Sequence, residues 1–181
     1  MPVPIVAAPE SARPAEDAAT QQRDSLARLY LAEMPKLTRF LMRTGASAYE
    51  AADAAHEAFA QAAVEWHRIK VPEKWLRTVA YRCYLRQIDH RTHPSDPVPD
   101  RPGGTCPVTE VTLREDNQRV LDALAQLPPT QRQVMAWTQD GFTYAEISRE
   151  LGIEIAAVRQ NHRRARMRLK QILGLLTGGT Q

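Results

Sequence analysis

The segment THPSDPVPDRPGGTCP, residues 92–107, limits the possible folds of this chain more than any other feature. Its five prolines and two glycines exclude a long helix, because proline has no backbone N–H to donate and glycine loses more backbone entropy than other residues. The segment also carries little charge. We therefore expect a flexible linker between two folded parts.

Both flanking parts are predicted to be helical, since no alternating strand pattern of useful length occurs in the sequence. The expected fold is all-α, with two small helical domains joined by the Pro-rich linker. The predicted organisation is a disordered tail over residues 1–23, a helical domain over 24–91, the linker over 92–111, a second helical domain over 112–174 and a frayed end over 175–181.

The first part is predicted to contain three helices. Apolar residues recur at steps of three and four as far as Gly45, and Pro35 is expected to kink or break this run. Ser47 and Glu50 form a capping-box pattern that begins a second, alanine-rich helix. A third helix is expected from about Pro72 to His90. The apolar positions of the first helix are Leu26, Leu29, Tyr30, Leu37, Phe40 and Leu41.

The second part begins with another capping-box pattern, Thr112 with Glu115, followed by apolar periodicity as far as Leu127. Pro128 and Pro129 are predicted to end that helix and to begin the next, because proline fits the first turn of a helix but not its interior.

The stretch GFTYAEISRELGIEIAAVRQNHRRARMRL, residues 141–169, has the spacing of a helix-turn-helix. Thr143 and Glu146 form a capping box, and Gly152 permits a tight turn before a second helix that begins near Ile155. Ser148 is small where two steeply crossing helices must approach closely. In such a motif the second helix is the one that enters a DNA major groove.

This second helix is strongly basic, because every charged side chain from Ile155 to the C-terminus is positive. A charged face is often only solvated, but such a face usually mixes both signs. We therefore favour phosphate anchoring and base reading by the outward side chains. His162 lies on or near the inward stripe, where a packed structural role is expected. The inward stripe is predicted to consist of Val158, Ala165, Leu169 and Ile172.

Composition narrows the classes of protein. With 181 residues, of which 43% are hydrophobic and 25% charged, the chain matches soluble globular proteins. No apolar run approaches the roughly 20 residues that span a bilayer, and the N-terminus lacks the basic region of a secretion signal. A cytoplasmic protein without membrane insertion is expected. The two cysteines do not form a disulfide framework, and Cys83 is expected to be a buried thiol.

Three stretches together resemble bacterial RNA polymerase sigma factors of the extracytoplasmic-function (ECF) type, group 4 of the sigma-70 family. LPPTQRQVMAWTQDGFTYAEISRELGIEIAAVRQNHRRARMRL, residues 127–169, resembles region 4, which binds the −35 promoter element. YEAADAAHEAF and PEKWLRTVAYRCYLRQIDHR, residues 49–59 and 72–91, resemble region 2. The resemblance extends from about Asp24 to Leu173.

The resemblance implies a non-enzymatic protein that binds core RNA polymerase and directs promoter-specific transcription initiation. Its implied partners are the β′ and β subunits of the polymerase, promoter DNA and an anti-sigma factor, and it implies no cofactor and no metal. Asp53 and Glu57 match acidic positions of the helix that docks on the β′ coiled coil. Phe59 matches an aromatic position of that helix, either as a polymerase contact or as a core residue.

The helix that begins just before Trp75 matches the one that meets the −10 element. Its basic, polar surface suits a separated DNA strand, since positive charge follows the backbone while an unstacked base enters a pocket. The implied contact residues are Lys74, Trp75, Arg77, Arg82 and Arg86. An unusual −10 preference is expected because the family usually has other residues at His56, Arg82, Arg86, Asp89 and His90.

In the second domain the resemblance implies contacts to the −35 duplex. Arg164 is expected to read a guanine and Arg166 to bind a phosphate. The implied contact residues are Arg159, Gln160, Arg163, Arg164 and Arg166. The family usually has other residues at Ala156, Ala157, Gln160 and His162, so promoter preference is expected to be unusual while the docking mode is retained. The linker also allows the two domains to fold together and to cover both DNA surfaces.

Two other classes of protein remain open at this stage. A helix-turn-helix regulator that acts without replacing a sigma factor accounts for the second domain but leaves the first unexplained. A zinc protease is suggested by HEAFA, residues 56–60, but Ala60 stands where such a motif has its second histidine. A zinc site would also need regular ligand spacing. The remaining candidate ligands, His90, His93, Cys83 and Cys106, are irregularly spaced.

Overall fold

The structure is a computed structural model that describes residues 13–92 and 115–174, with side chains over 20–90 and 118–174. Most of the predicted linker, the start of the predicted tail, the frayed end and the Thr112 capping box lie outside the described residues.

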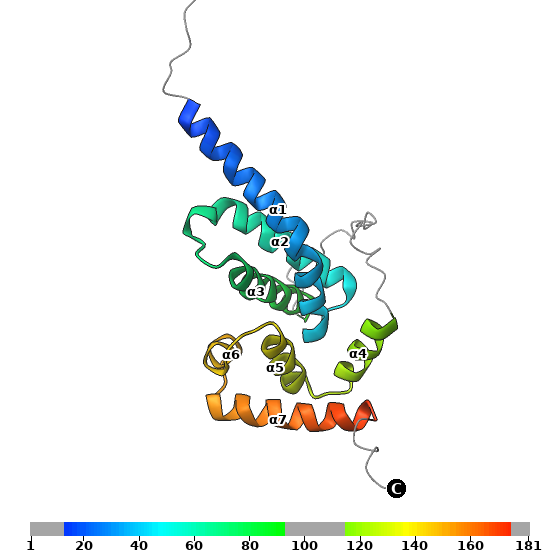
Figure 1. The fold of residues 1–181 in the computed structure, drawn as a ribbon. Helices are drawn as coiled ribbons and strands as arrows, with labels where there is room; N and C mark the ends of the chain where they lie inside the picture. Colours follow the sequence, from blue (N-terminus) through cyan, green and yellow to red (C-terminus); the bar gives the residue numbers. More distant parts are fainter. Residues whose placement is uncertain (1–12, 93–114, 175–181) are drawn as a thin grey trace, which may run out of the picture.

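The described residues form seven α-helices and one 3₁₀ turn and contain no strand, which confirms the all-α prediction. The elements are α1 (Arg13–Thr44), α2 (Ala48–Glu65), η1 (Trp66–Arg68), α3 (Pro72–Thr92), α4 (Glu115–Ala125), α5 (Pro129–Gln139), α6 (Tyr144–Leu151) and α7 (Ile155–Ile172). Helices α1 to α3 form one block and α4 to α7 a second, with α5 lying between α7 and the first block (Figure 1).

Helix α1 differs from the sequence prediction at two places. It begins at Arg13, within the segment predicted to be a disordered tail, and it continues through Pro35 without a break. An interior proline costs a helix about 3 kcal/mol. Burial of Met34 and Leu37 on either side contributes about 1.5–3 kcal/mol each, which together matches or exceeds that cost. The predicted break at Pro35 is therefore wrong.

The predicted helix ends are confirmed where local chemistry sets them. The Ser47 hydroxyl accepts a hydrogen bond from the backbone N–H of Glu50, and the Glu50 carboxylate in turn accepts one from the backbone N–H of Ser47. Pro128 and Pro129 occupy the N-cap and first positions of α5. The alanines of α2 allow the close packing of this helix against α1 and α3. These fully or nearly fully buried alanines are Ala51, Ala54, Ala55, Ala58 and Ala62.

The buried side chains form one main cluster that passes through both blocks. Its centre is the fully buried Trp137 of α5, which meets the rings of Phe40, Tyr81 and Phe142 edge to face at centroid distances of 4.9, 5.3 and 4.6 Å. Such aromatic pairs add about 0.5–1.5 kcal/mol each beyond burial. The two predicted domains therefore share a core. A smaller cluster joins α4 and α5 to α7 through Leu124, Leu127, Met135 and Ala165.

Candidate nucleic-acid interfaces

Three of the basic side chains predicted on α3 face carboxylates of the second block. The Lys74 ammonium lies 2.7 Å from the Glu146 carboxylate of α6, and the Arg82 guanidinium lies 3.2 Å from the Glu150 carboxylate of the same helix. Arg77 donates from Nε to Asp140, the residue that caps the C-terminus of α5. Three of the five predicted −10 residues are thus paired with acidic groups of the second block.

Arg77 is the most enclosed of these residues, with 10% of its side chain exposed. Besides Asp140 it donates to a Glu33 carboxylate oxygen of α1 at 3.0 Å and to the backbone carbonyl of Glu73 at 2.9 Å. Two further pairs complete the network. The Arg43 guanidinium lies 3.4 Å from the Asp140 carboxylate, and the Lys36 ammonium lies 2.7 Å from the Glu33 carboxylate. Removing one partner of such a buried network leaves charges without compensation, which typically costs 3–5 kcal/mol.

The charged state of this network follows from its geometry. Burial alone would lower the pKa of Arg77, but the hydrogen bonds and charges of Asp140 and Glu33 raise it above the ordinary value. Burial would likewise raise the pKa of Glu33, but hydrogen bonds from Lys36 and Arg77 outweigh burial and lower it. Both shifts favour the charged forms, so Arg77 and Glu33 face each other as an ion pair across the neutral range.

At the α6 end of the interface, Glu146 has two functions. Its carboxylate accepts from the backbone N–H and the hydroxyl of Thr143, completing the predicted capping box, and it pairs with Lys74. The Lys74 hydrogen bond and then those from Thr143 lower the pKa of Glu146 to about 2. The Lys74 ammonium also lies 5.1 Å from the centre of the Phe142 ring, within the range of a cation–π contact.

The other two residues predicted to contact the −10 element lie elsewhere. Trp75 is half-buried and packs against the main core. Arg86 lies toward α2, where its guanidinium is 2.7 Å from the Glu57 carboxylate and 3.2 Å from the Cys83 sulfur. The five predicted −10 residues therefore do not share one face.

The acidic residues predicted to bind polymerase lie on the face of α2 that adjoins the second half of α3. Asp53 is exposed and accepts a 2.7 Å hydrogen bond from the Gln87 amide, while Glu57 is half-buried beside Arg86. Phe59 is only 5% exposed and packs edge to face on Tyr30 at a centroid distance of 5.0 Å. The structure therefore supports the core alternative for Phe59, because a side chain so enclosed cannot itself contact a partner.

Helix α7 presents a contrasting surface. No ion pair joins any of its side chains to another residue in the described part of the chain, and the five predicted −35 residues are all exposed. Val158 and Ala165 are fully buried and Leu169 partly buried, as predicted, but Ile172 is 36% exposed near the end of the helix. The expectation that folding together covers both DNA surfaces is therefore wrong for α7. The exposed residues are Arg159, Gln160, Arg163, Arg164 and Arg166.

The turn before α7 is held by more than the predicted glycine. Gly152 caps α6 with φ of 65°, a left-handed conformation that favours glycine. Ser148, predicted only to be small, also donates a 2.6 Å hydrogen bond from its hydroxyl to the backbone carbonyl of Ile153. The angle between α6 and α7 is therefore fixed by a side chain as well as by packing.

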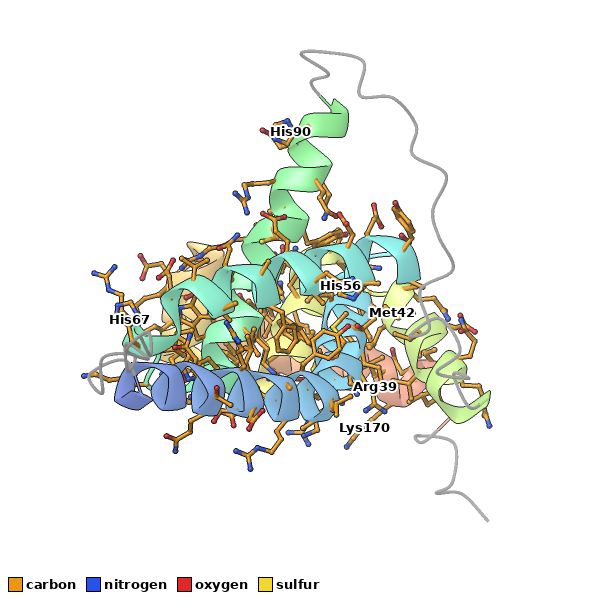
Figure 2. The ribbon with its side chains drawn as sticks, turned by 90° about the horizontal axis from the view of Figure 1, so that it is seen from above. Arg39, Met42, His56, His67, His90 and Lys170 are labelled. Carbon is orange, nitrogen blue, oxygen red and sulfur yellow. The ribbon has the colours of Figure 1, made fainter. Side chains whose placement is uncertain are left out.

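The zinc-site alternative gains no support from the described residues. Among the side chains that the structure describes, residues 20–90 and 118–174, no group of three or more His, Cys, Asp or Glu could hold a metal ion. Figure 2 shows His56, His67 and His90 well separated on the first block. His93 and Cys106 lie outside the described residues. None of the helices described is long and apolar enough to cross a membrane.

The acidic side of the interface between the blocks was not predicted from the sequence. Asp140 and Glu150 were assigned no contact, and Glu146 was predicted only as a helix cap. Trp137 was not singled out, although Val134, Met135, Ala136 and Trp137 are four consecutive apolar residues in one helix. Four consecutive apolar residues cover a full turn of a helix, so this turn must be covered on all sides. That run was therefore the available signal for a shared core.

Comparisons with known proteins agree with this architecture. The family described as Sigma-70, region 4 matches residues 117–169. The solved sigma factor RpoE from Bartonella quintana, in complex with the anti-sigma factor NepR, has a TM-score of 0.62 at 21% identity, covering 84% of this chain and 98% of that one. CnrH, in complex with the cytosolic domain of CnrY, has a TM-score of 0.55 at 21% identity, covering 90% and 96%. Both share the fold described above.

The sequence relatives are more specific. The ECF RNA polymerase sigma factor SigM of Mycobacterium tuberculosis, in strains Erdman and H37Rv, is 30% identical over 159 residues, which is 86% of this chain and 79% of the relative. The match spans both helical blocks. This chain therefore belongs to the ECF family of RNA polymerase sigma factors.

Proposed function

We propose that the chain binds core RNA polymerase and directs initiation at specific promoters, with residues 24–91 acting as region 2 and residues 112–174 as region 4. The observation that carries this proposal is the exposed basic face of α7, which follows a helix-turn-helix turn and forms no ion pair with any acidic residue that the structure describes. This face is available to a DNA duplex, and α7 enters the major groove of the −35 element.

Helix α3 is proposed to capture the melted −10 strand after the two blocks separate. Lys74, Arg77 and Arg82 are paired with Glu146, Asp140 and Glu150 in the closed arrangement. The phosphates of a DNA strand carry the same charge as these carboxylates and can take their place once the second block moves away. The closed arrangement is thus proposed to restrain −10 binding until polymerase holds the blocks apart.

Helix α2 is proposed to dock on polymerase through Asp53 and Glu57. Both carboxylates lie on one face beside the end of α3, and Phe59 supports that face from the core. The solved relatives RpoE and CnrH are bound to NepR and CnrY. We propose that this chain too is restrained by an anti-sigma protein.

The test is reconstitution of the full chain with core polymerase on genomic DNA, followed by genome-wide mapping of transcription starts. The expected result is a defined set of starts that share −35 and −10 sequences. Asp53→Lys should abolish association with the core enzyme, whereas Glu65→Lys, an exposed position near the end of the same helix, should not. Starts no different from those of core enzyme alone, together with specific duplex binding, would instead favour a regulator that does not replace a sigma factor.

A further inference from the structure

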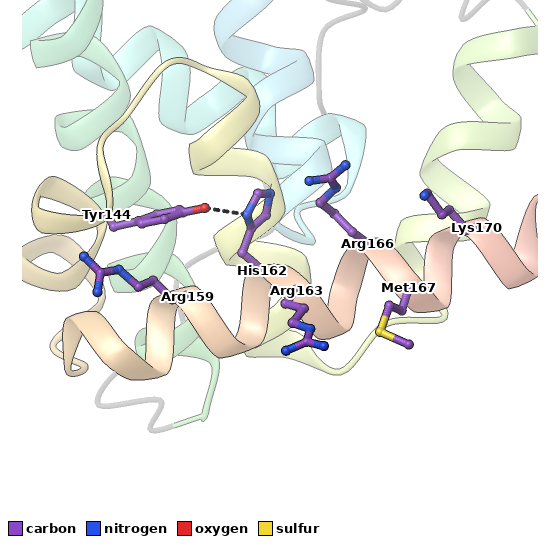
Figure 3. A pocket seen from close by; sticks show the side chains of 7 residues that line it. All are labelled: Tyr144, Arg159, His162, Arg163, Arg166, Met167 and Lys170. Carbon is purple, nitrogen blue, oxygen red and sulfur yellow. Dashed lines mark hydrogen bonds between the residues drawn. The ribbon is translucent and has the colours of Figure 1, made fainter.

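A basic hollow of about 270 Å³ lies between the start of α6 and one side of α7. It is much larger than the roughly 30 Å³ that one water molecule occupies. Four of its lining side chains are cationic, and none is a carboxylate among the residues that the structure places there. The lining residues, drawn in Figure 3, are Tyr144, Arg159, His162, Arg163, Arg166, Met167 and Lys170.

In the hollow, Tyr144 and His162 form a hydrogen bond in which either side chain can be the donor, depending on the protonation of the imidazole. The Tyr144 hydroxyl oxygen lies 2.8 Å from His162 Nδ1, and Figure 3 shows these two side chains pointing toward each other across the hollow. A neutral imidazole can accept a hydrogen bond from the tyrosine hydroxyl at Nδ1. A protonated imidazole must donate there instead, which leaves the Tyr144 O–H free to donate to an anion.

We propose that this hollow seats a phosphodiester group of duplex DNA and that His162 takes up a proton as the phosphate enters, so that duplex binding by α7 strengthens as the pH falls. The inference rests on the proposed DNA-binding role of α7. The proton added to the imidazole strengthens attraction to the phosphate, and Tyr144 then donates to a phosphate oxygen.

The groups that face His162 determine the sign of this effect. Helix α6 contributes the Tyr144 hydroxyl, and the charged side chains that α7 contributes to the hollow are all cations. The α4 and α5 side chains that pack on α7 in the smaller core cluster are apolar: Leu124, Leu127 and Met135. Burial and then the charge of Arg166 lower the pKa of His162, so the free protein keeps this ring neutral near pH 7.

A phosphate in the hollow opposes the charge of Arg166 and raises the pKa of His162. Binding therefore takes up a proton wherever the pH lies below the bound-state pKa and above the free-state pKa. Within that window the affinity rises up to about tenfold for each unit that the pH falls, and above the window it is flat.

The position of the hollow also divides α7 into two stripes. Arg159, Arg163 and Arg166 line the hollow and follow each other at steps of three and four, whereas Gln160 and Arg164 do not line it. The hollow therefore belongs to backbone recognition, and Arg164 is left to read a base.

The experiment measures binding of the full chain to a fluorescent duplex of random sequence, at about pH 6 and about pH 8 and constant salt. A random duplex suffices because phosphate contacts are independent of sequence. The wild type should bind about three- to tenfold more tightly at the lower pH. His162→Gln, which keeps a polar side chain but does not titrate, should remove this ratio. Arg164→Ala should retain the ratio.

A second readout does not depend on the variant's stability. The His162 ring should titrate at higher pH with duplex bound than without, as followed by NMR, and Tyr144→Phe should weaken duplex binding more at about pH 6 than at about pH 8, because Tyr144 donates to the phosphate only when His162 is protonated. Equal pH dependence in wild type and His162→Gln overturns the inference but leaves DNA binding by α7 intact. Absence of duplex binding at either pH overturns the proposed function as well. If the NMR-measured pKa of His162 rises with inorganic phosphate but not with duplex, the hollow binds a free anion and the DNA assignment is overturned.

Discussion

Helices α3 and α7 both carry a series of basic side chains, but they differ in what those side chains contact. On α3, Lys74, Arg77 and Arg82 are bonded to carboxylates of the second block, whereas no ion pair reaches α7 within the described residues. Positive charge in a sequence therefore does not by itself indicate an available surface. In the proposed mechanism, α7 meets DNA in this arrangement, and α3 first exchanges its internal partners for phosphates.

The contrast is strongest at a buried residue of α3. Arg77→Met should destabilise the protein by about 3–5 kcal/mol, because Glu33 and Asp140 lose their shared buried partner. Arg164→Met, the matched change on exposed α7, should change stability by less than about 0.5 kcal/mol. Urea unfolding of both variants makes the comparison, and equal effects would remove the distinction between the two helices.

Base reading by α7 gives the next largest effect. Arg164→Ala should weaken promoter binding by about 1–3 kcal/mol at one base pair and relax the preference there. Binding measured across single-base variants of a mapped −35 element checks this. Uniform weakening on every variant would reassign Arg164 to phosphate.

Phosphate binding by the same helix should show in the salt dependence. Arg166→Ala should reduce the slope of log affinity against log salt by roughly 0.9 if Arg166 neutralises one phosphate. Affinity is measured for wild type and variant over a salt series on one duplex. An unchanged slope would place Arg166 outside the DNA interface.

The exposed pair between the blocks should contribute less. Glu150→Lys places a second cation beside Arg82 and should destabilise the closed arrangement by about 0.2–1 kcal/mol. Small-angle scattering should then detect a larger population of an expanded form. Adding Arg82→Glu restores opposite charges at this contact and should restore the compact form. Compact scattering from the single variant would show that this pair does not help to hold the blocks together.

The smallest expected effect is the loss of stabilisation by the Glu146 carboxylate at low pH. The lowered pKa of Glu146 means that its stabilisation is present above its ordinary pKa of 4.5 and is lost as the pH falls toward about 2. Lys74→Met should raise this pKa but not restore it fully, because the Thr143 hydrogen bonds remain. NMR titration of the Glu146 carboxyl measures both values, and an identical pKa in the variant would argue against the pair in solution.

The sequence predicted the features that depend on near neighbours. The capping boxes of Ser47 and Thr143 and the turn at Gly152 each depend on residues within a few positions, so their patterns were sufficient. The exposed face of α7 followed from the same local periodicity. These elements include most of the predicted −35 surface.

The features that were missed depend on contacts between distant segments. Helix α1 passes Pro35 because its neighbours are buried against other helices, which local pattern does not reveal. Arg77 and Asp140 are 63 residues apart, and nothing in either neighbourhood predicts the bond between them. Arg86 was predicted to contact the −10 element from its position in the family pattern, but in the structure its guanidinium pairs with the Glu57 carboxylate. Family patterns thus located the helices and left the partners of their charges undetermined.

The most direct test of the account is to hold the two blocks together. A chain with Arg82→Cys, Glu150→Cys and Cys106→Ser is joined by a cleavable bismaleimide, and promoter-dependent transcription by the reconstituted polymerase is compared before linking, after linking and after cleavage. The account predicts that linking abolishes transcription, leaves duplex binding by α7 unchanged, and is reversed by cleavage. Full transcription from the linked protein would contradict the claim that α3 must leave its internal carboxylates before it binds DNA.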